Sequence, residues 1–135
     1  FRPRPTDTDE RWLTQRIATT HDIHHVVAGF GTEPQGESGV LAITAAQIGF
    51  PAYVLLNGAA QLGSFRFQTE RFEGISRGIT HGHAIARQAS CLALARWEEG
   101  WDKPIHQWRQ ELGLLDAADT EPYGLDRQLG ALTPA

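Results

Sequence analysis

The spacing of its apolar residues favours one way for this chain to build a core, which is to pack helices together. Within residues 9–28 the apolar side chains recur at helical intervals, at Trp12, Leu13, Ile17, Ile23, Val26 and Val27, as in a helix with one apolar face. Strand-like alternation is nearly absent elsewhere. A chain of 135 residues is long enough for one domain that buries roughly two thirds of its unfolded surface. We therefore predict a single compact all-α domain over residues 1–135.

Turn-forming residues divide the rest of the chain into further segments. A Gly- and Pro-rich loop is predicted at 29–36, and the apolar residues 40–63 predict two short buried helices in a hairpin, broken at Gly49–Phe50–Pro51. Residues 63–70 alternate and favour a short extended connector. A long helix is expected at about 70–99, bent near Gly78 or Gly82, and another from an N-cap at Asp102 to a stop at Gly113. Residues 116–135 turn polar, which predicts a surface tail.

Composition argues against several classes of protein. The net charge of −4 comes without a cluster of basic residues, so nothing indicates a nucleic-acid partner. The single cysteine, Cys91, leaves no internal disulfide and suits a reducing compartment. Polar and helix-breaking residues interrupt the apolar run at 40–63, which argues against a membrane span. The chain starts at Phe1 and contains no methionine, so we expect a fragment or a trimmed N-terminus.

Titratable residues gather between Thr20 and Glu37, beside valines and a phenylalanine. On a helix His21 and His25 lie one turn apart and nearly in line, and Asp22 falls within about 100° of arc from them. Glu37 follows twelve residues after His25, beyond the loop, where it would stand in the first turn of the next helix. Two imidazoles with carboxylates suit a divalent metal, with zinc first and manganese or iron as alternatives.

Spacing alone leaves other arrangements open for this cluster. His24 is three residues from His21, and Glu33 competes with Glu37 for the same place. Pairs of histidines at i and i+4 are common on helices, so the residues also fit a polar helix end whose imidazoles are solvated or bonded to backbone carbonyls. The metal site and the solvated helix end are the two hypotheses that a structure has to separate.

Two motifs resemble those of the ubiquinone (coenzyme Q) biosynthesis protein four family. The stretch "HDIHHVVAGFGTEPQGE" fits the pattern H-D-x-x-H-x(11)-E, and "TEPQGE" is similar to the family's approach to its glutamate. The later "RWEEGWDKPIHQWRQELGL", residues 96–114, is similar to its C-terminal W-E…W…P-(I/L)…R…L-(G/N) helix pair. The resemblance runs from about residue 10 to residue 115, and His24 is not part of the pattern.

The resemblance implies an all-α fold in which His21, Asp22, His25 and Glu37 bind zinc or a similar divalent ion. It implies a polyprenylated quinone precursor or isoprenoid lipid as ligand and other ubiquinone biosynthesis enzymes as partners. A bacterial protein of this kind would be cytoplasmic and peripheral to the inner membrane, and a eukaryotic one would sit on the matrix face of the mitochondrial inner membrane. Family members usually carry further helices before this stretch, so an N-terminal part of the family fold is expected to be missing.

Three functional classes follow from these observations. The first is a metal-dependent enzyme that removes the ring carboxylate at C1 of the precursor with oxidative introduction of a hydroxyl. The second is a non-catalytic, metal-stabilised scaffold that binds isoprenoid lipid and organises the biosynthetic complex. The third is a metallohydrolase, which is disfavoured because Asp22 stands where HExxH enzymes have glutamate and no third histidine is near. No catalytic residue is assigned, and the apolar hairpin also suits a homodimer interface.

Overall fold

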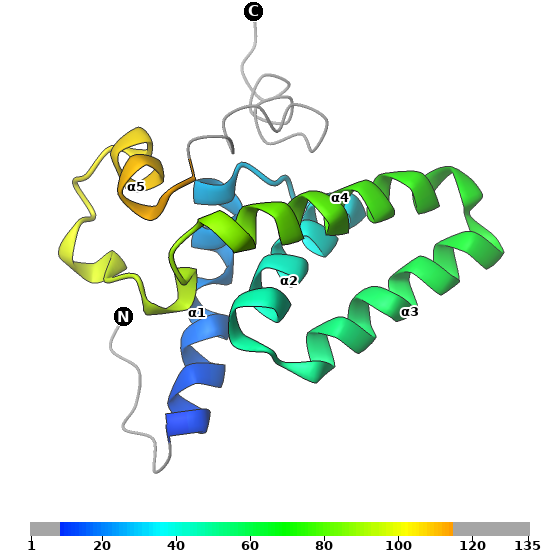
Figure 1. Ribbon diagram of the computed structural model, residues 1–135, viewed down its shortest axis with the longest axis horizontal. Helices are drawn as coiled ribbons and strands as arrows, with labels where there is room; N and C mark the ends of the chain where they lie inside the picture. The colour runs from blue at the N-terminus through cyan, green and yellow to red at the C-terminus, as the bar shows by residue number, and fades with distance from the viewer. Residues whose placement is uncertain (1–8, 115–135) are drawn as a thin grey trace, which may run out of the picture.

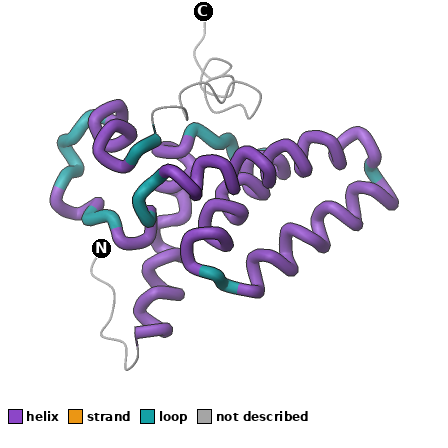
Figure 2. The backbone as a smooth tube through the Cα atoms, viewed as in Figure 1, coloured by secondary structure: helices purple, strands orange, loops and turns teal. Residues whose placement is uncertain are grey.

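The computed structural model describes residues 9–114, and within this range the fold is helical without a strand (Figure 2). Five α-helices follow one another: α1 (Asp9–Ala28), α2 (Pro34–Ile48), α3 (Pro51–Phe67), α4 (Thr69–Gln88) and α5 (Ile105–Leu112). Two short 3-10 helices, η1 (Leu92–Leu94) and η2 (Trp97–Glu99), lie between α4 and α5. The predicted all-α class is confirmed. The expected surface tail, 116–135, lies outside the described residues.

Helix α2 is central to the arrangement (Figure 1). It packs most extensively against α4, and both helices contact α3, which lies at the outer edge of the molecule. Helix α1 packs against α2 on one side and against α5 and η1 on the other. Helix α1 therefore stands between the α2–α4 pair and the C-terminal segment, in contact with both.

The core lies where α1, α2, α4 and the C-terminal segment meet. Its largest fully buried side chains come from all of these parts: Phe30, Val40, Ile43, Ile85, Leu92 and Leu114, together with the polar His24. Trp97 joins the same cluster at 2% exposure. Because a protein interior is close-packed, this cluster fixes the distance between α1 and its two neighbours.

Glycines allow α2 and α4 to approach with their backbones almost in contact. A Cβ on Gly78 would overlap the carbonyl oxygen of Gln35, and a Cβ on Gly82 would overlap the carbonyl oxygen of Gly39. Both glycines are buried in α4, one turn apart. A side chain at either position would push away the first half of α2, which includes Glu37.

The predicted helix ends are correct where glycine or proline sets them. Pro34 and Pro51 stand in the first turns of α2 and α3, where the missing N–H costs no hydrogen bond. Gly29, Gly49 and Gly113 take the left-handed conformation that ends α1, α2 and α5, with φ near +75° in each.

Three predicted boundaries are wrong. The helix expected to reach residue 99 ends at Gln88, because Ala89 is extended and the side chain of Gln47 bonds the backbone of Ala89, Ser90 and Leu92. Residues 63–67, expected to be extended, continue α3. Helix α5 begins at Ile105 with Pro104 as its N-cap rather than near Asp102. At none of these three positions does the sequence have a glycine that would end a helix or an acidic side chain that would cap its start.

The predicted hairpin of apolar helices exists, but its second helix is not buried. Helix α2 is largely enclosed, whereas the buried residues of α3 are the polar Asn57 and Ser64. The large apolar side chains of α3 face outward, with Leu55 and Leu62 each 73% exposed. The apolar composition of the segment is the same for both helices, so composition could not separate them.

We expect Gly82→Ala to lower the free energy of unfolding by about 1–3 kcal/mol, because the new Cβ meets a backbone carbonyl that cannot move freely. Gly58→Ala is the matched control, since Gly58 is also inside a helix but has open space around it. That control should gain about 0.5–1 kcal/mol from helix propensity. Urea unfolding of both variants measures the difference, and equal effects would contradict the close crossing of α2 and α4.

Candidate metal centre

Helix α1 and the first turn of α2 bring His21, His25 and Glu37 together. The Nε2 atoms of the two histidines are 3.1 Å apart. The carboxylate of Glu37 lies 3.1 Å from Nε2 of His21 and 3.3 Å from Nε2 of His25, through its two different oxygens. One ligand atom from each residue falls within 4.8 Å of the others. This is the convergence that a shared cation requires.

The local sequence places Glu37 against the histidines. His21 and His25 stack on one face of α1, and their rings meet edge to face at a centroid distance of 4.8 Å. Gly29, with φ +77°, reverses the chain after α1, and its N–H donates to the carbonyl of His25. A Cβ on Gly36 would overlap the carbonyl oxygen of Gly31. Gly36 therefore lets α2 start close to the loop.

Backbone carbonyls orient His25 from behind. Its Nδ1 lies 3.1 Å from the carbonyl oxygens of both Phe30 and Gly31, so Nδ1 carries the proton and donates it. Nε2 is directed at His21 and Glu37, and in the neutral imidazole with its proton on Nδ1 it carries the lone pair that a metal would bind. A histidine whose second nitrogen is bonded to a carbonyl is the usual arrangement behind a metal ligand. These carbonyls were not found from the sequence, because backbone atoms leave no pattern in it.

The donor set fits a divalent cation. Two imidazole nitrogens and one carboxylate are three protein ligands, as in zinc sites that keep a position open. The His25 side chain is 5% exposed, whereas those of His21 and Glu37 are 26% and 41% exposed. The cluster is therefore fixed on its inner side and reachable from solvent on its outer side, where a further ligand can enter.

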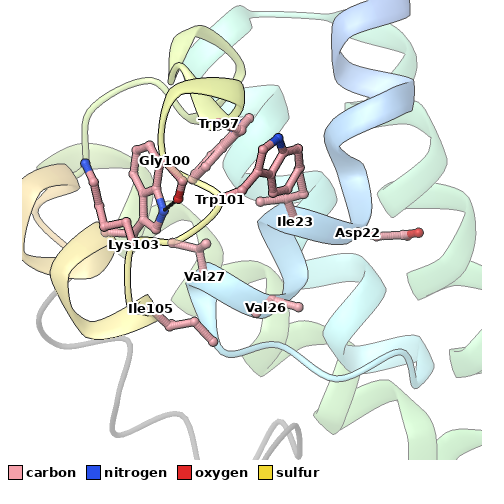
Figure 3. A pocket seen from close by; sticks show the side chains of 10 residues that line it. Asp22, Ile23, Val26, Val27, Trp97, Gly100, Trp101, Lys103 and Ile105 are labelled. Carbon is pink, nitrogen blue, oxygen red and sulfur yellow. Dashed lines mark hydrogen bonds between the residues drawn. The ribbon is translucent and has the colours of Figure 1, made fainter. Parts of the chain in front are cut away.

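Asp22, the fourth predicted ligand, lies outside this group of three. It is exposed and stands at the edge of a cavity of about 330 Å³ on another side of α1 (Figure 3). Apolar and aromatic residues form most of that cavity: Ile23, Val26, Val27, Trp97, Trp101, Ile105 and Trp108. Asp22 points away from the tryptophans in Figure 3. Its role as a ligand stays a prediction.

The two competing residues also lie apart from the cluster. His24 is buried at 1% exposure and its Nε2 is 3.2 Å from the hydroxyl of Thr20. Burial lowers the pKa of His24 to about 4, with the nearby His21 as the next cause. It is therefore neutral near pH 7. Glu33 is exposed and accepts a hydrogen bond from the amide of Gln35.

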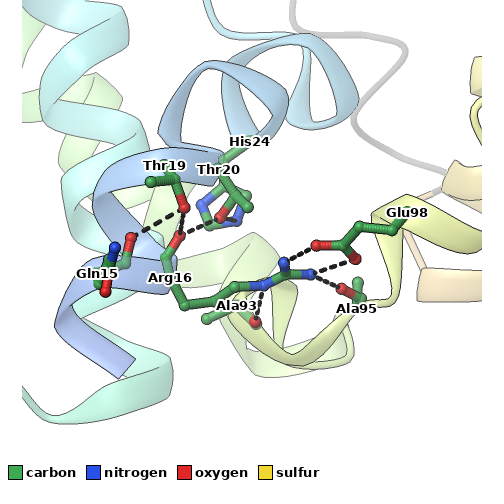
Figure 4. Close-up of polar contacts among 8 residues, drawn as sticks. All are labelled: Gln15, Arg16, Thr19, Thr20, His24, Ala93, Ala95 and Glu98. Atoms are coloured by element: carbon green, nitrogen blue, oxygen red, sulfur yellow. Dashed lines mark hydrogen bonds and ion pairs between the residues drawn. The ribbon is translucent and has the colours of Figure 1, made fainter. Parts of the chain in front are cut away.

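A buried arginine ties α1 to the C-terminal segment (Figure 4). The guanidinium of Arg16 donates to the carbonyls of Ala93 and Ala95 at 3.2 Å and 2.6 Å, and it pairs with both carboxylate oxygens of Glu98. Arg16 lies 7% exposed in the middle of α1, just over one turn before His21. The sequence did not lead us to Arg16. Its one signal for this contact is that the partner, Glu98, belongs to the second motif.

The Arg16–Glu98 pair predicts a pH-dependent contribution to stability. The hydrogen bond from Arg16 lowers the pKa of Glu98 below its ordinary value. A lowered folded-state pKa gives stability that is full above the unfolded-state value and is lost as the pH falls through the folded one. We expect wild type to exceed Glu98→Gln in free energy of unfolding near pH 7, and the difference to vanish in acid.

Urea unfolding at a series of pH values measures this difference. Glu99→Gln is the matched control, because Glu99 is the next residue and pairs with Arg96, whose side chain is 79% exposed. A difference between wild type and Glu98→Gln that stays constant from neutral pH into acid would contradict the pair.

Comparison with known proteins agrees with both motifs. Residues 6–118 match the family described as "Coenzyme Q (ubiquinone) biosynthesis protein Coq4". The chain is 31% identical over 111 residues to the mitochondrial ubiquinone biosynthesis protein COQ4 homolog of Bos taurus, covering 82% of this chain and 41% of the bovine protein. With the Xenopus laevis homolog it is 28% identical over 109 residues, covering 81% of this chain and 38% of that protein.

A solved structure has the same fold. It is the crystal structure of a protein from Nostoc punctiforme, provisionally described as a ubiquinone biosynthesis protein. It aligns with a TM-score of 0.76 at 30% identity, over 84% of this chain and 56% of that one. Compared with the curated Bos taurus and Xenopus laevis proteins, this chain spans about two fifths of their length. Its match over residues 6–118 and its fold place it in the Coq4 family of ubiquinone biosynthesis proteins.

Proposed function

We propose that the cluster of His21, His25 and Glu37 binds a divalent metal, and that the protein uses it in ubiquinone biosynthesis. The proposed reaction is the oxidative decarboxylation and hydroxylation at C1 of a polyprenylated benzoquinone precursor, in which the carboxylate leaves as CO2, water or dioxygen supplies the hydroxyl oxygen, and an external two-electron oxidant such as dioxygen accepts the electrons. The observation that carries the proposal is the convergence of the two Nε2 atoms and the Glu37 carboxylate, with His25 oriented by the carbonyls of Phe30 and Gly31.

The chain's own residues would each have a part in this reaction. A bound divalent ion would supply positive charge that stabilises the ring carboxylate and phenolate as charge develops. His25 holds its Nε2 in place from a buried position, whereas the half-exposed His21 and Glu37 border the open side. Asp22 follows His21 in the chain and is exposed, but it lies outside the group of three, so to bind the metal or accept a proton its carboxylate would have to turn toward the cluster.

The identity of the metal decides how much of the chemistry this protein performs. Two imidazoles with a carboxylate suit zinc first, and iron or manganese as well. Zinc has no redox chemistry, so with zinc the oxidative step would need a partner enzyme. Iron or manganese would allow the step to take place at this site.

A scaffold is the second candidate function. In this case the metal would hold α1 and α2 together, and the protein would bind isoprenoid lipid and other ubiquinone biosynthesis enzymes without catalysis. The position of the cluster between α1 and α2 favours it, because a cation held there would stabilise the contact of the two helices without any turnover. Either function suits a peripheral location at the membrane that holds the precursor, on the cytoplasmic face in a bacterium and on the matrix face in mitochondria.

Elemental analysis of protein purified without chelators tests the metal. We expect about one ion per chain in wild type, and a loss of at least about tenfold in His25→Ala. His24→Ala is the matched control, because His24 is the adjacent histidine but lies outside the cluster, and it should keep the metal. Asp22→Asn tests whether Asp22 is a fourth ligand. If Asp22 does not bind the metal, this variant should contain as much metal as wild type. Wild-type metal content in His25→Ala would overturn the site.

The substitution Glu37→Ala in the intact protein separates the enzyme from the scaffold. The enzyme hypothesis predicts that turnover of a C1-carboxylated precursor is lost while the biosynthetic complex still assembles. Chromatography of the precursor and co-purification of the partner enzymes measure the two effects. If the complex dissociates and the isolated wild-type protein never converts the precursor, the enzyme hypothesis is wrong and the scaffold is correct.

A further inference from the structure

Helix α3 has the opposite orientation to an ordinary surface helix: it buries polar side chains and exposes large apolar ones. Its first fifteen residues, 51–65, contain no charged side chain. Its buried positions are the polar Asn57 and Ser64, with Gln61 half-buried between them. Its large apolar side chains are exposed, at fractions between 55% and 79%: Val54, Leu55, Leu56, Leu62, Phe65 and Phe67. We call these six side chains the α3 face.

Hydrogen bonds fix this orientation of the helix. The amide of Asn57 donates to the carbonyl of Ser38 at 3.1 Å, and the amide of Gln61 donates to the hydroxyl of Ser76 at 3.2 Å. These bonds attach the polar side of α3 to α2 and to α4. Rotating α3 to bury the apolar side would break both of these hydrogen bonds. The outward direction of the α3 face is therefore built into the packing.

The charged residues of the α3–α4 hairpin carry a net positive charge. Between Glu37 and Glu70 the chain contains a single charged residue, Arg66. Residues 49–90 contain four arginines and two glutamates, whereas the rest of the chain contains eight basic and fourteen acidic residues. A basic hairpin with an apolar outer side thus belongs to a chain that is acidic elsewhere.

Aromatic residues stand at both ends of the α3 face. Phe50 and Tyr53 pack together at its start, with ring centroids 5.6 Å apart. At its end Phe65 packs on Phe72, and the guanidinium of Arg66 lies 5.2 Å from the centroid of the Phe67 ring. Tyr53 and Arg66 have an apolar part and a polar end, as side chains at the boundary between hydrocarbon and head groups do, and the phenylalanines suit the hydrocarbon side of that boundary.

We infer that the α3 face is a docking surface for an anionic lipid bilayer, with α3 lying in the plane of the interface. The apolar side chains would enter the acyl boundary, and Arg66 and Arg71 would meet the anionic head groups. No helix among residues 9–114 is long and apolar enough to cross a membrane. A second copy of the chain fits less well, because α3 offers no acidic residue to the arginines of a partner helix.

The inference rests on the proposed peripheral location and not on the metal. Flotation with vesicles tests it, using phosphatidylcholine alone and phosphatidylcholine in which about one third is replaced by phosphatidylglycerol. We expect wild type to partition to the anionic vesicles at least about tenfold more strongly than to the neutral ones. The double substitution Leu55→Glu with Leu62→Glu should lower that binding by at least about tenfold.

Leu94→Glu is the matched control, because Leu94 is 62% exposed but lies on η1, away from α3. It should bind vesicles as wild type does, and circular dichroism should show that all variants are folded. Metal content measured on the same samples separates the two proposals, since His25→Ala should lose metal and keep vesicle binding.

Three results would overturn the inference. The first is that wild type binds no vesicle, or binds neutral and anionic vesicles equally. The second is that Leu94→Glu weakens binding as much as the α3 substitutions do. The third is a dimer, seen by light scattering, that dissociates on the α3 substitutions while vesicle binding stays unchanged, because the face would then be a contact between copies of the chain.

Discussion

The close crossing of α2 and α4 determines where the other helices can pack. Gly78 and Gly82 let the carbonyls of Gln35 and Gly39 touch the α4 backbone, so the start of α2 lies deep against α4. The side of α2 that carries Glu37 then remains free to meet α1. A bulkier residue at either glycine would push the first half of α2, with Glu37, away from α4, and a metal site tolerates a misplacement of only about 0.5 Å. Small residues far from the metal centre therefore set its geometry.

Helix α1 joins this crossing to the C-terminal segment through two different faces. One face carries His21 and His25 toward α2, and another buries Arg16 against the carbonyls of η1 and the carboxylate of Glu98. A charge as buried as that of Arg16 is stable only because four acceptor oxygens bond it: the carbonyls of Ala93 and Ala95 and both carboxylate oxygens of Glu98. Removing one partner leaves the charge without compensation, so the second motif supports the first through α1.

The sequence was sufficient for what is periodic and local, and insufficient for what is made between segments. The pair His21 and His25 and the return of Glu37 followed from helical spacing and a loop of known length. The carbonyls of Phe30 and Gly31 behind His25, and the clamp at Arg16, depend on tertiary packing and could not be read from residue types. The prediction for the end of α4 was wrong for the same reason. The helix ends at Gln88 because the side chain of Gln47, far earlier in the chain, bonds the backbone of Ala89, Ser90 and Leu92.

A cation bound by His21, His25 and Glu37 would matter to the fold as well as to chemistry, because these ligands come from two helices, α1 and α2. His25 donates its Nδ1 proton to the loop, and its Nε2 lies 3.1 Å from Nε2 of His21. Nε2 of His21 lies 3.1 Å from both Nε2 of His25 and the Glu37 carboxylate, and a ring nitrogen carries at most one hydrogen, so it cannot donate to both. A divalent ion would accept all three donors at once, and its binding energy would add to the stability of the α1–α2 contact. The cluster is therefore a joint between two helices as well as a candidate centre of reaction.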